Sequence, residues 1–231
     1  MLINCTLISD ICRFFKFCNL ISTSLIPPNN FFNMLVDEDL LFHYGGQLVK
    51  FTKNDMIFRE SEIPKFYYQI KYGNVKINNY HQEGKEFIHS LPSAGHCLGE
   101  TFIFSERPYP VNAVAMNDVA VIKVGIARFF ELIHSDKSIL FKLYQYTSER
   151  MHYRYVMLNN LSSTNTFSKI ICVMDCLKQY HNVTEQYGYQ IPYTRLEIAS
   201  LTGLRIETVI RVLKKMEREN IVKNIGGKIF Y

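Results

Sequence analysis

The order of apolar and polar positions changes twice along this chain of 231 residues. Residues 1–33 are rich in apolar side chains and end at the break Pro27-Pro28-Asn29-Asn30. Between residues 48 and 124, short apolar runs alternate with turn residues, a pattern typical of an all-β unit. After Gly125 the apolar residues recur at helical spacing. We therefore predict an α+β chain in which a β unit is followed by helices.

The β unit contains four clear β-rich runs, at residues 66–70, 75–80, 86–91 and 119–124. Turn residues separate the runs, namely Tyr72-Gly73-Asn74, Gln82-Glu83-Gly84, Ser93-Ala94-Gly95 and the segment from Pro108 to Pro110. Because a rolled or closed sheet leaves few strand edges unpaired, these runs favour a barrel. We place this domain at residues 34–137. Residues 1–33 are then either an N-terminal extension or a segment upstream of a true start at Met34.

A long helix is expected at residues 138–161, because this segment contains neither proline nor glycine. One stripe of this helix has the spacing of a coiled-coil seam. The stripe consists of Ile139, Leu143, Tyr146, Arg150, Tyr153, Met157 and Asn160. Two interpretations stay open: the stripe forms a dimer contact, or it packs on the barrel, since Arg150 and Asn160 are poor seam residues.

Residues 162–231 hold the motif that carries the functional prediction. Thr194 and Glu197 have the spacing of a capping box, which starts a helix. Gly203 stands where a tight turn needs a positive φ. A second helix follows, and its inward side is supplied by Val209, Val212, Leu213 and Met216. This pattern predicts a helix-turn-helix.

The outward side of the second helix carries residue types that read DNA bases. An arginine such as Arg211 can donate two hydrogen bonds to guanine, a carboxylate such as Glu207 can accept one from cytosine, and isoleucine can contact a thymine methyl group. The alternative is an ion pair between Glu207 and Arg211 on a solvated helix. The candidate DNA-binding residues are Thr194, Arg195, Arg205, Ile206, Glu207, Thr208, Ile210, Arg211, Lys214 and Lys228.

Two short β runs at the C-terminus flank Gly226-Gly227, which predicts a hairpin, the wing of a winged helix-turn-helix. We expect Lys223 and Lys228 either to lie along the DNA backbone or to be ordinary solvated side chains. Residues 191–231 carry eight Lys and Arg against four Glu, within a chain of net charge +5. This excess suits a polyanionic partner such as double-stranded DNA, and an ordinary solvated basic face is the alternative that charge alone leaves open.

The six cysteines are scattered over a chain too large to need disulfides, so a reduced cytoplasmic location is expected. Asp10, Arg13 and Lys16 interrupt every apolar run in the first 26 residues, so neither a membrane span nor a signal peptide is predicted. No nucleophile-plus-base, phosphate-loop or metal-ligand motif is present in the sequence, and the chain is not expected to be an enzyme.

The order of barrel, long helix, helix-turn-helix and wing resembles the family of the cyclic-AMP receptor protein and the fumarate and nitrate reduction regulator. The resemblance is most specific at residues 194–217, where Glu207, Thr208 and Arg211 fall on positions that contact DNA in the family. It extends to the barrel through residues 66–70, 73–77, Gly84-Lys85-Glu86 and Gly99-Glu100. It implies a cyclic-nucleotide-binding-like jelly roll, and a homodimeric transcription regulator that reads an inverted repeat and contacts RNA polymerase.

The effector pocket departs from this family. In the cyclic-AMP binders, Gly-Glu opens a phosphate-binding cassette that an Arg-Ser pair closes, and the pair falls here on Pro110-Val111. Arg107 is basic but lies elsewhere in the loop. The candidate effector pocket therefore consists of Gly99, Glu100, Arg107, Pro110 and Val111, and we expect an effector other than cyclic AMP, or none. A cyclic-nucleotide-responsive activator is the alternative.

Two further departures concern cofactors and DNA sequence. Cys5, Cys12, Cys18 and Cys97 lack the close spacing of the iron-sulfur branch, so no cluster or other cofactor is expected. Arg205 stands where a helix prefers a serine or aspartate cap, and we expect it to bind phosphate. Ile206 replaces a base-reading arginine, so the target of the cyclic-AMP receptor protein does not carry over.

Overall fold

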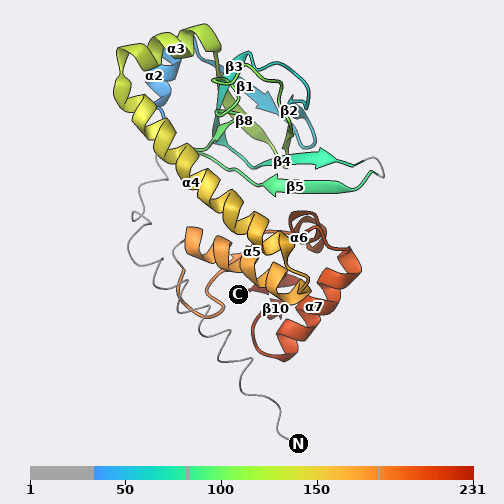
Figure 1. The fold of residues 1–231 in the computed structure, drawn as a ribbon. Helices are drawn as coiled ribbons and strands as arrows, with labels where there is room; N and C mark the ends of the chain where they lie inside the picture. Colours follow the sequence, from blue (N-terminus) through green and yellow to red (C-terminus); the bar gives the residue numbers. More distant parts are fainter. Residues whose placement is uncertain (1–33, 82–83, 182) are drawn as a thin grey trace, which may run out of the picture. The chain divides into compact units, whose positions relative to one another are not determined.

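The computed structural model describes residues 34–231 apart from residues 82–83 and 182 (Figure 1). The predicted N-terminal extension, with Cys5, Cys12 and Cys18, lies outside the described residues, as does most of the turn predicted at residues 82–84.

Eight antiparallel strands form the barrel, in two sheets of four. One sheet has the order β1-β8-β3-β6 and the other the order β2-β7-β4-β5. The strands are β1 (Gln47–Phe51), β2 (Met56–Phe58), β3 (Phe66–Tyr72), β4 (Val75–Tyr80), β5 (Glu86–Ser90), β6 (Cys97–Leu98), β7 (Asn112–Ala115) and β8 (Val119–Gly125). The predicted fold class is confirmed, and the four predicted runs correspond to β3, β4, β5 and β8.

A buried glutamine attaches the start of the described chain to the barrel. Gln69 of β3 is fully buried, and its Nε2 donates to the carbonyl of Val36 at 2.7 Å. Its Oε1 accepts from the amide of Val36 at 3.0 Å and from the hydroxyl of Tyr67 at 2.7 Å. Val36 lies just before α2 (Glu38–His43), so Gln69 fixes where that helix begins. Burying these polar groups is favourable only because each has a partner.

The long helix α4 (Lys137–Ser162) follows α3 (Ile126–Ser135) and lies where the sequence predicts it. Of the two interpretations of the stripe at residues 139–160, packing within the chain applies to its buried members. Ile139, Leu143, Tyr146 and Met157 are buried by residues of the chain itself. The hydroxyl of Tyr146 donates to the carbonyl of Cys97 in the barrel at 3.4 Å, and Met157 packs with Ile88 of β5 and with Val173 and Leu201 of the C-terminal domain.

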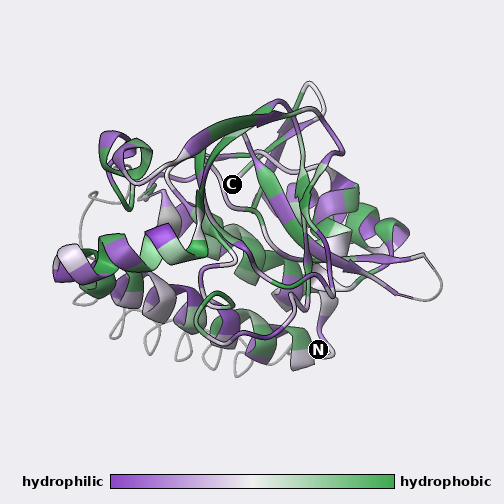
Figure 2. Cartoon of the chain, turned by 90° about the horizontal axis from the view of Figure 1, so that it is seen from above, coloured by the Kyte–Doolittle hydropathy of each residue, from purple (hydrophilic) through white to green (hydrophobic). Residues whose placement is uncertain are grey.

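A second apolar stripe runs along the opposite side of α4 and is exposed. Its members recur at heptad spacing, with Ser148 filling the one polar position. They are Phe141 (75% exposed), Tyr144 (75%), Met151 (50%), Tyr155 (66%) and Leu158 (66%). Figure 2 shows hydrophobic and hydrophilic bands alternating along the long helices. The helix therefore has two apolar sides, and only one is covered by the described residues of this chain.

Arg150 connects α4 to the barrel through its charged end. Its Nη1 donates to the hydroxyl of Tyr146 at 2.9 Å, and its Nη2 donates to Oγ of Ser90 on β5 at 3.4 Å. Its Nε lies 3.6 Å from Oε1 of Glu100, whose side chain is 3% exposed. The guanidinium thus meets one carboxylate and two hydroxyl groups where α4 crosses the barrel.

The C-terminal domain combines three helices with a small sheet. The helices are α5 (Thr166–Tyr180), α6 (Arg195–Thr202) and α7 (Ile206–Arg218). The predicted wing is formed by β10 (Lys223–Ile225) and β11 (Lys228–Phe230). Positive φ angles at Gly226 and Gly227 match a type I′ turn. A third strand, β9 (Gln190–Ile191), pairs with β11 and was not predicted from the sequence.

Within the described part of the chain, no helix is long and apolar enough to cross a bilayer.

The environment of His96 generates a prediction about pH. Burial, followed by the positive charge of Arg150, lowers the pKa of His96 from 6.5 to about 4. The unfolded chain therefore binds a proton more readily than the folded chain between these values, and stability should fall as the pH falls from 6.5 towards 4. Between about pH 7 and about pH 5, His96 should account for a loss on the order of 2 kcal/mol in the free energy of unfolding.

Urea unfolding of the wild-type chain and of His96→Gln at these two pH values measures this contribution. The variant should lose less stability than the wild type over the interval. His134→Gln, at an exposed histidine of α3, is the matched control and should behave as the wild type. An identical pH dependence in His96→Gln and the wild type would contradict the assignment.

Candidate nucleic-acid interface

The first helix of the helix-turn-helix begins at the predicted capping box. Oγ1 of Thr194 accepts from the amide of Glu197 at 3.2 Å, and the carboxylate of Glu197 accepts from the amide of Thr194 at 2.7 Å. This pair satisfies two amides at the start of α6 that would otherwise lack partners. Thr194 therefore acts within the domain, and the structure places its side chain in the cap.

Gly203 ends α6 and sets the direction of α7. It has φ +66°, a left-handed conformation that glycine adopts without a Cβ penalty, and its amide donates to the carbonyl of Ala199. Two residues later, Arg205 is the N-cap residue of α7, with no side-chain capping bond and its side chain exposed. The turn thus leaves a cation free at the N-terminus of the second helix.

The two sides of α7 differ as predicted. Val209, Val212, Leu213 and Met216 are buried in the core of the C-terminal domain, which also includes Ile198 and Ala199 of α6. The other side is exposed and carries Glu207, Ile210, Arg211 and Lys214. Because the buried side is held by α6, the exposed side is presented on a rigid helix.

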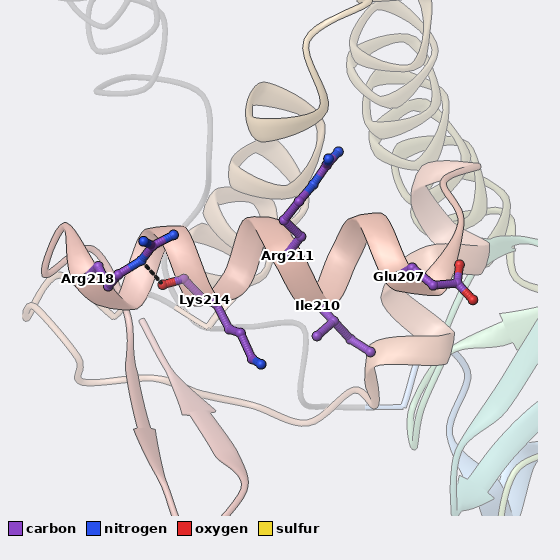
Figure 3. A pocket seen from close by; sticks show the side chains of 5 residues that line it. All are labelled: Glu207, Ile210, Arg211, Lys214 and Arg218. Atoms are coloured by element: carbon purple, nitrogen blue, oxygen red, sulfur yellow. Dashed lines mark hydrogen bonds between the residues drawn. The ribbon is translucent and has the colours of Figure 1, made fainter.

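A shallow hollow of about 380 Å³ lies along the exposed side of α7. It is lined by Glu207, Ile210, Arg211, Lys214 and Arg218, whose side chains follow one another along the helix (Figure 3). Arg218 was not among the predicted contact residues, although its position four residues after Lys214 places it on the same side of α7. Three of the five lining residues are cationic, which suits a surface that meets phosphate groups.

Glu207 and Arg211 do not form the ion pair that was the alternative interpretation. Among the salt bridges of residues 34–231, the one on α7 joins Nζ of Lys215 to Oε1 of Glu219 at 3.7 Å. Glu207 and Arg211 are both exposed and available for other partners.

Other predicted contact residues have different environments. Ile206 is half-buried and packs against the core of the C-terminal domain, so it does not project outward as predicted. Thr208 is also half-buried. Nη1 of Arg195 donates to the carbonyl of Gly227 and so joins α6 to the wing. Lys228 is exposed on the wing, whereas Nζ of Lys223 lies 4.2 Å from the ring centroid of Tyr187.

The candidate effector residues of the barrel are dispersed. Gly99 has φ +69°, and a Cβ there would lie 2.7 Å from the ring of Tyr109. Glu100 is buried and faces Arg150, as described above. Arg107 and Pro110 are exposed, and Val111 packs against the core of the barrel. The structure therefore does not place Arg107 beside Glu100 inside the barrel.

Aromatic side chains occupy the interior next to Gly99. Tyr109 stacks on Phe58 with ring centroids 3.9 Å apart. The ring of Phe102 lies edge-on to the ring of Tyr109, with centroids 5.8 Å apart. The hydroxyl of Tyr109 is buried and finds no hydrogen-bond partner among the described residues. The groups that line this part of the barrel are thus mostly apolar, with few donors for a phosphate.

Comparisons with known proteins agree with both domains. Residues 48–136 match the family described as cyclic nucleotide-binding domain, and residues 173–230 match the Crp-like helix-turn-helix domain. The cAMP-activated global transcriptional regulator CRP of Salmonella typhimurium is 30% identical over 182 residues, which cover 77% of this chain and 85% of that protein. The cAMP-activated global transcriptional regulator Vfr of Pseudomonas aeruginosa is 27% identical over 182 residues, which cover 77% of this chain and 84% of that protein.

Solved structures share the fold. The c-di-GMP responsive global regulator CLP of Xanthomonas campestris superposes with a TM-score of 0.70 at 19% identity, over 84% of this chain and 98% of that chain. A CooA mutant of Carboxydothermus hydrogenoformans gives a TM-score of 0.68 at 14% identity, over 84% of this chain and 87% of that chain. From the matched domains and the identity to its relatives, this chain belongs to the CRP/FNR family of DNA-binding transcription regulators.

Proposed function

We propose that the protein binds an inverted repeat in double-stranded DNA as a homodimer, with α7 of each subunit in a major groove and without a requirement for cyclic AMP. The observation that carries this proposal is the exposed side of α7, where Glu207, Ile210 and Arg211 lie next to Lys214 and Arg218. A cytoplasmic location, contact with RNA polymerase and the absence of enzymatic activity belong to the same proposal.

The residues on α7 divide into base-reading and phosphate-binding groups. Arg211 and Glu207 have the hydrogen-bonding groups for guanine and cytosine, and the 40% exposed Ile210 offers a methyl group to thymine. Lys214 and Arg218 lie towards the C-terminal end of α7 and can contact the phosphate groups of the DNA backbone. Arg205 and Lys228 supply cations from the turn and the wing. Base contacts then specify the site, while the cations position the helix.

The exposed stripe of α4 is the proposed dimer contact. Two copies of a helix with apolar residues at heptad spacing can bury that stripe against each other. Two α7 helices in such a dimer would read the two halves of an inverted repeat, because a two-fold axis relates them. The proposed contact uses a different side of α4 from the stripe at residues 139–160, whose apolar members are buried within the chain.

The environment of Gly99 and Glu100 argues against cyclic AMP as the effector. Pro110 and Val111 stand where the cyclic-AMP binders have Arg-Ser, so the guanidinium that would bind the cyclic phosphate is missing from that position. The charge that faces Glu100 comes instead from Arg150 of the same chain at 3.6 Å. The relatives in Salmonella and Pseudomonas are described as cAMP-activated. This chain shares their fold and departs from the family in the phosphate-binding pair.

A cyclic-nucleotide-responsive activator is the second candidate. The observation that favours it is Gly99-Glu100, which keeps its positive φ and its buried carboxylate at the start of the family's cassette.

Replacing Arg211 tests the assignment of α7 as the reading helix. Arg211→Ala should cost about 1–3 kcal/mol on the specific site and should relax the preference at one base pair of each half-site, because a bidentate contact is lost. Fluorescence anisotropy on the preferred duplex and on single-base variants, at one salt concentration, measures both effects. Arg205→Ala should weaken binding to all duplexes about equally.

The matched control is Lys215→Ala, since Lys215 is also an exposed cation of α7 but pairs with Glu219. It should leave the base preference unchanged. If Arg211→Ala kept the full sequence preference of the wild type, α7 would not be the base-reading element.

Replacing Tyr144 tests the dimer contact. Tyr144→Glu places a charge in the exposed stripe of α4 and should raise the dimer dissociation constant at least about 30-fold, as expected for a central aromatic residue worth about 2 kcal/mol. Sedimentation equilibrium measures the constant. Lys142→Glu, at an exposed position outside both stripes, is the control and should stay close to the wild type. Equal dimerisation of all three proteins would rule out this contact.

A further inference from the structure

We propose that Cys172 and Cys176 of α5 form a binding site for a soft two-coordinate cation, of which monovalent copper is the representative. The proposal concerns a part of the molecule that neither the DNA contact nor the effector pocket uses. It rests on the spacing of the two thiols, their exposure and the residues around them.

The helix places both sulfur atoms on one side. Side chains four residues apart lie on the same face of an α-helix, with Cβ atoms about 5–6 Å apart. Both cysteines lie within α5, and hydrogen bonding from Cys176 lowers the pKa of the Cys172 thiol, as expected for neighbouring side chains on one face. Two sulfurs that bind one ion at about 2.3 Å each, as in zinc sites, are at most about 4.6 Å apart, which this spacing allows.

The same spacing disfavours a disulfide between these residues. A disulfide needs Cβ atoms about 3.5–4.5 Å apart, less than a regular helix provides at this separation. Forming the bond would therefore distort α5, whereas an ion between the sulfurs needs no such change. The pair thus suits metal binding better than oxidation.

The residues around the two thiols favour a metal ion that needs only two ligands. Among the described residues, no group of three or more His, Cys, Asp or Glu side chains is placed to hold a metal ion. A site with two thiolates and no third ligand of these types favours a soft cation that accepts linear coordination, since thiolates select monovalent copper over hard cations. On binding, both thiols release their protons to solvent as two sulfur–metal bonds form, and no oxidation state changes.

Cys172 and Cys176 are partly exposed, in contrast to Cys97, which is fully buried in the barrel. Cys176 and Tyr153 both pack against a cluster that includes Met157 of α4, Val173 of α5 and Leu201 of α6. A bound ion would therefore lie where the long helix meets the DNA-binding domain.

Competition for monovalent copper under anaerobic conditions tests the proposal. The test protein is the full chain with Cys5→Ser, Cys12→Ser and Cys18→Ser, so that the thiols outside the described residues do not contribute. Copper alone is added as the probe, against a chromophoric chelator that reports free monovalent copper. We expect one copper bound per chain. Loss of an outer-shell partner costs about 10–100-fold in metal affinity, so loss of either ligand, in Cys172→Ser or Cys176→Ser, should cost at least about 100-fold.

Cys97→Ser in the same background is the matched control and should retain the wild-type affinity. Circular dichroism of each variant verifies that α5 and the rest of the chain stay folded. Thermal unfolding gives a second readout, because a ligand that binds the folded chain raises its Tm, and this rise should disappear with either serine at 172 or 176. Failure of the test protein to retain copper, or equal retention by Cys172→Ser or Cys176→Ser, would overturn the proposal. None of these outcomes depends on DNA binding.

Discussion

The charge of Arg150, whose side chain is only 19% exposed, is the constraint on which the junction between α4 and the barrel depends. A guanidinium removed from water is costly unless a carboxylate and hydrogen-bond acceptors surround it. Glu100, Tyr146 and Ser90 meet that requirement, so the position of α4 is tied to the turn at Gly99-Glu100 and to β5. The carboxylate that opens the ligand-binding cassette in cyclic-AMP binders is thereby engaged by a side chain of the protein itself.

This arrangement determines what α4 can offer to a second subunit. One side of the helix is buried within the chain at Ile139, Leu143, Tyr146 and Met157. The opposite side presents exposed aromatic and aliphatic residues at heptad spacing. Since the barrel and the DNA-binding domain are connected through the same helix, a dimer built on the exposed side would also set the spacing of the two α7 helices.

Local patterns in the sequence were sufficient to predict the helix-turn-helix. Thr194, Glu197 and Gly203 act over three or four residues, and the inward positions of α7 follow from helical periodicity. The choice between the two sides of α4 was not predictable in this way, because both sides are apolar and only the tertiary contact with the barrel distinguishes them. Short strands such as β6 and β9, of two residues each, also depend on partners distant in sequence.

Single residues differ from the sequence analysis for separate reasons. Ile206 was expected to face outward from its helical position, yet the core of the C-terminal domain partly covers it. Arg195, a predicted DNA contact, donates to the carbonyl of Gly227 in the wing, a partner that no local pattern contains. Arg218 is the last residue of α7, and helical spacing from Lys214 already places it on the exposed side.

We propose that this regulator reads an inverted repeat through α7 without cyclic AMP. Selection of the purified full chain on a randomised duplex library, with and without added cyclic AMP at one salt concentration, tests this proposal. The same inverted repeat should be enriched under both conditions. Enrichment only in the presence of cyclic AMP would contradict it, and would show that Pro110 and Val111 do not prevent the nucleotide from acting as the effector.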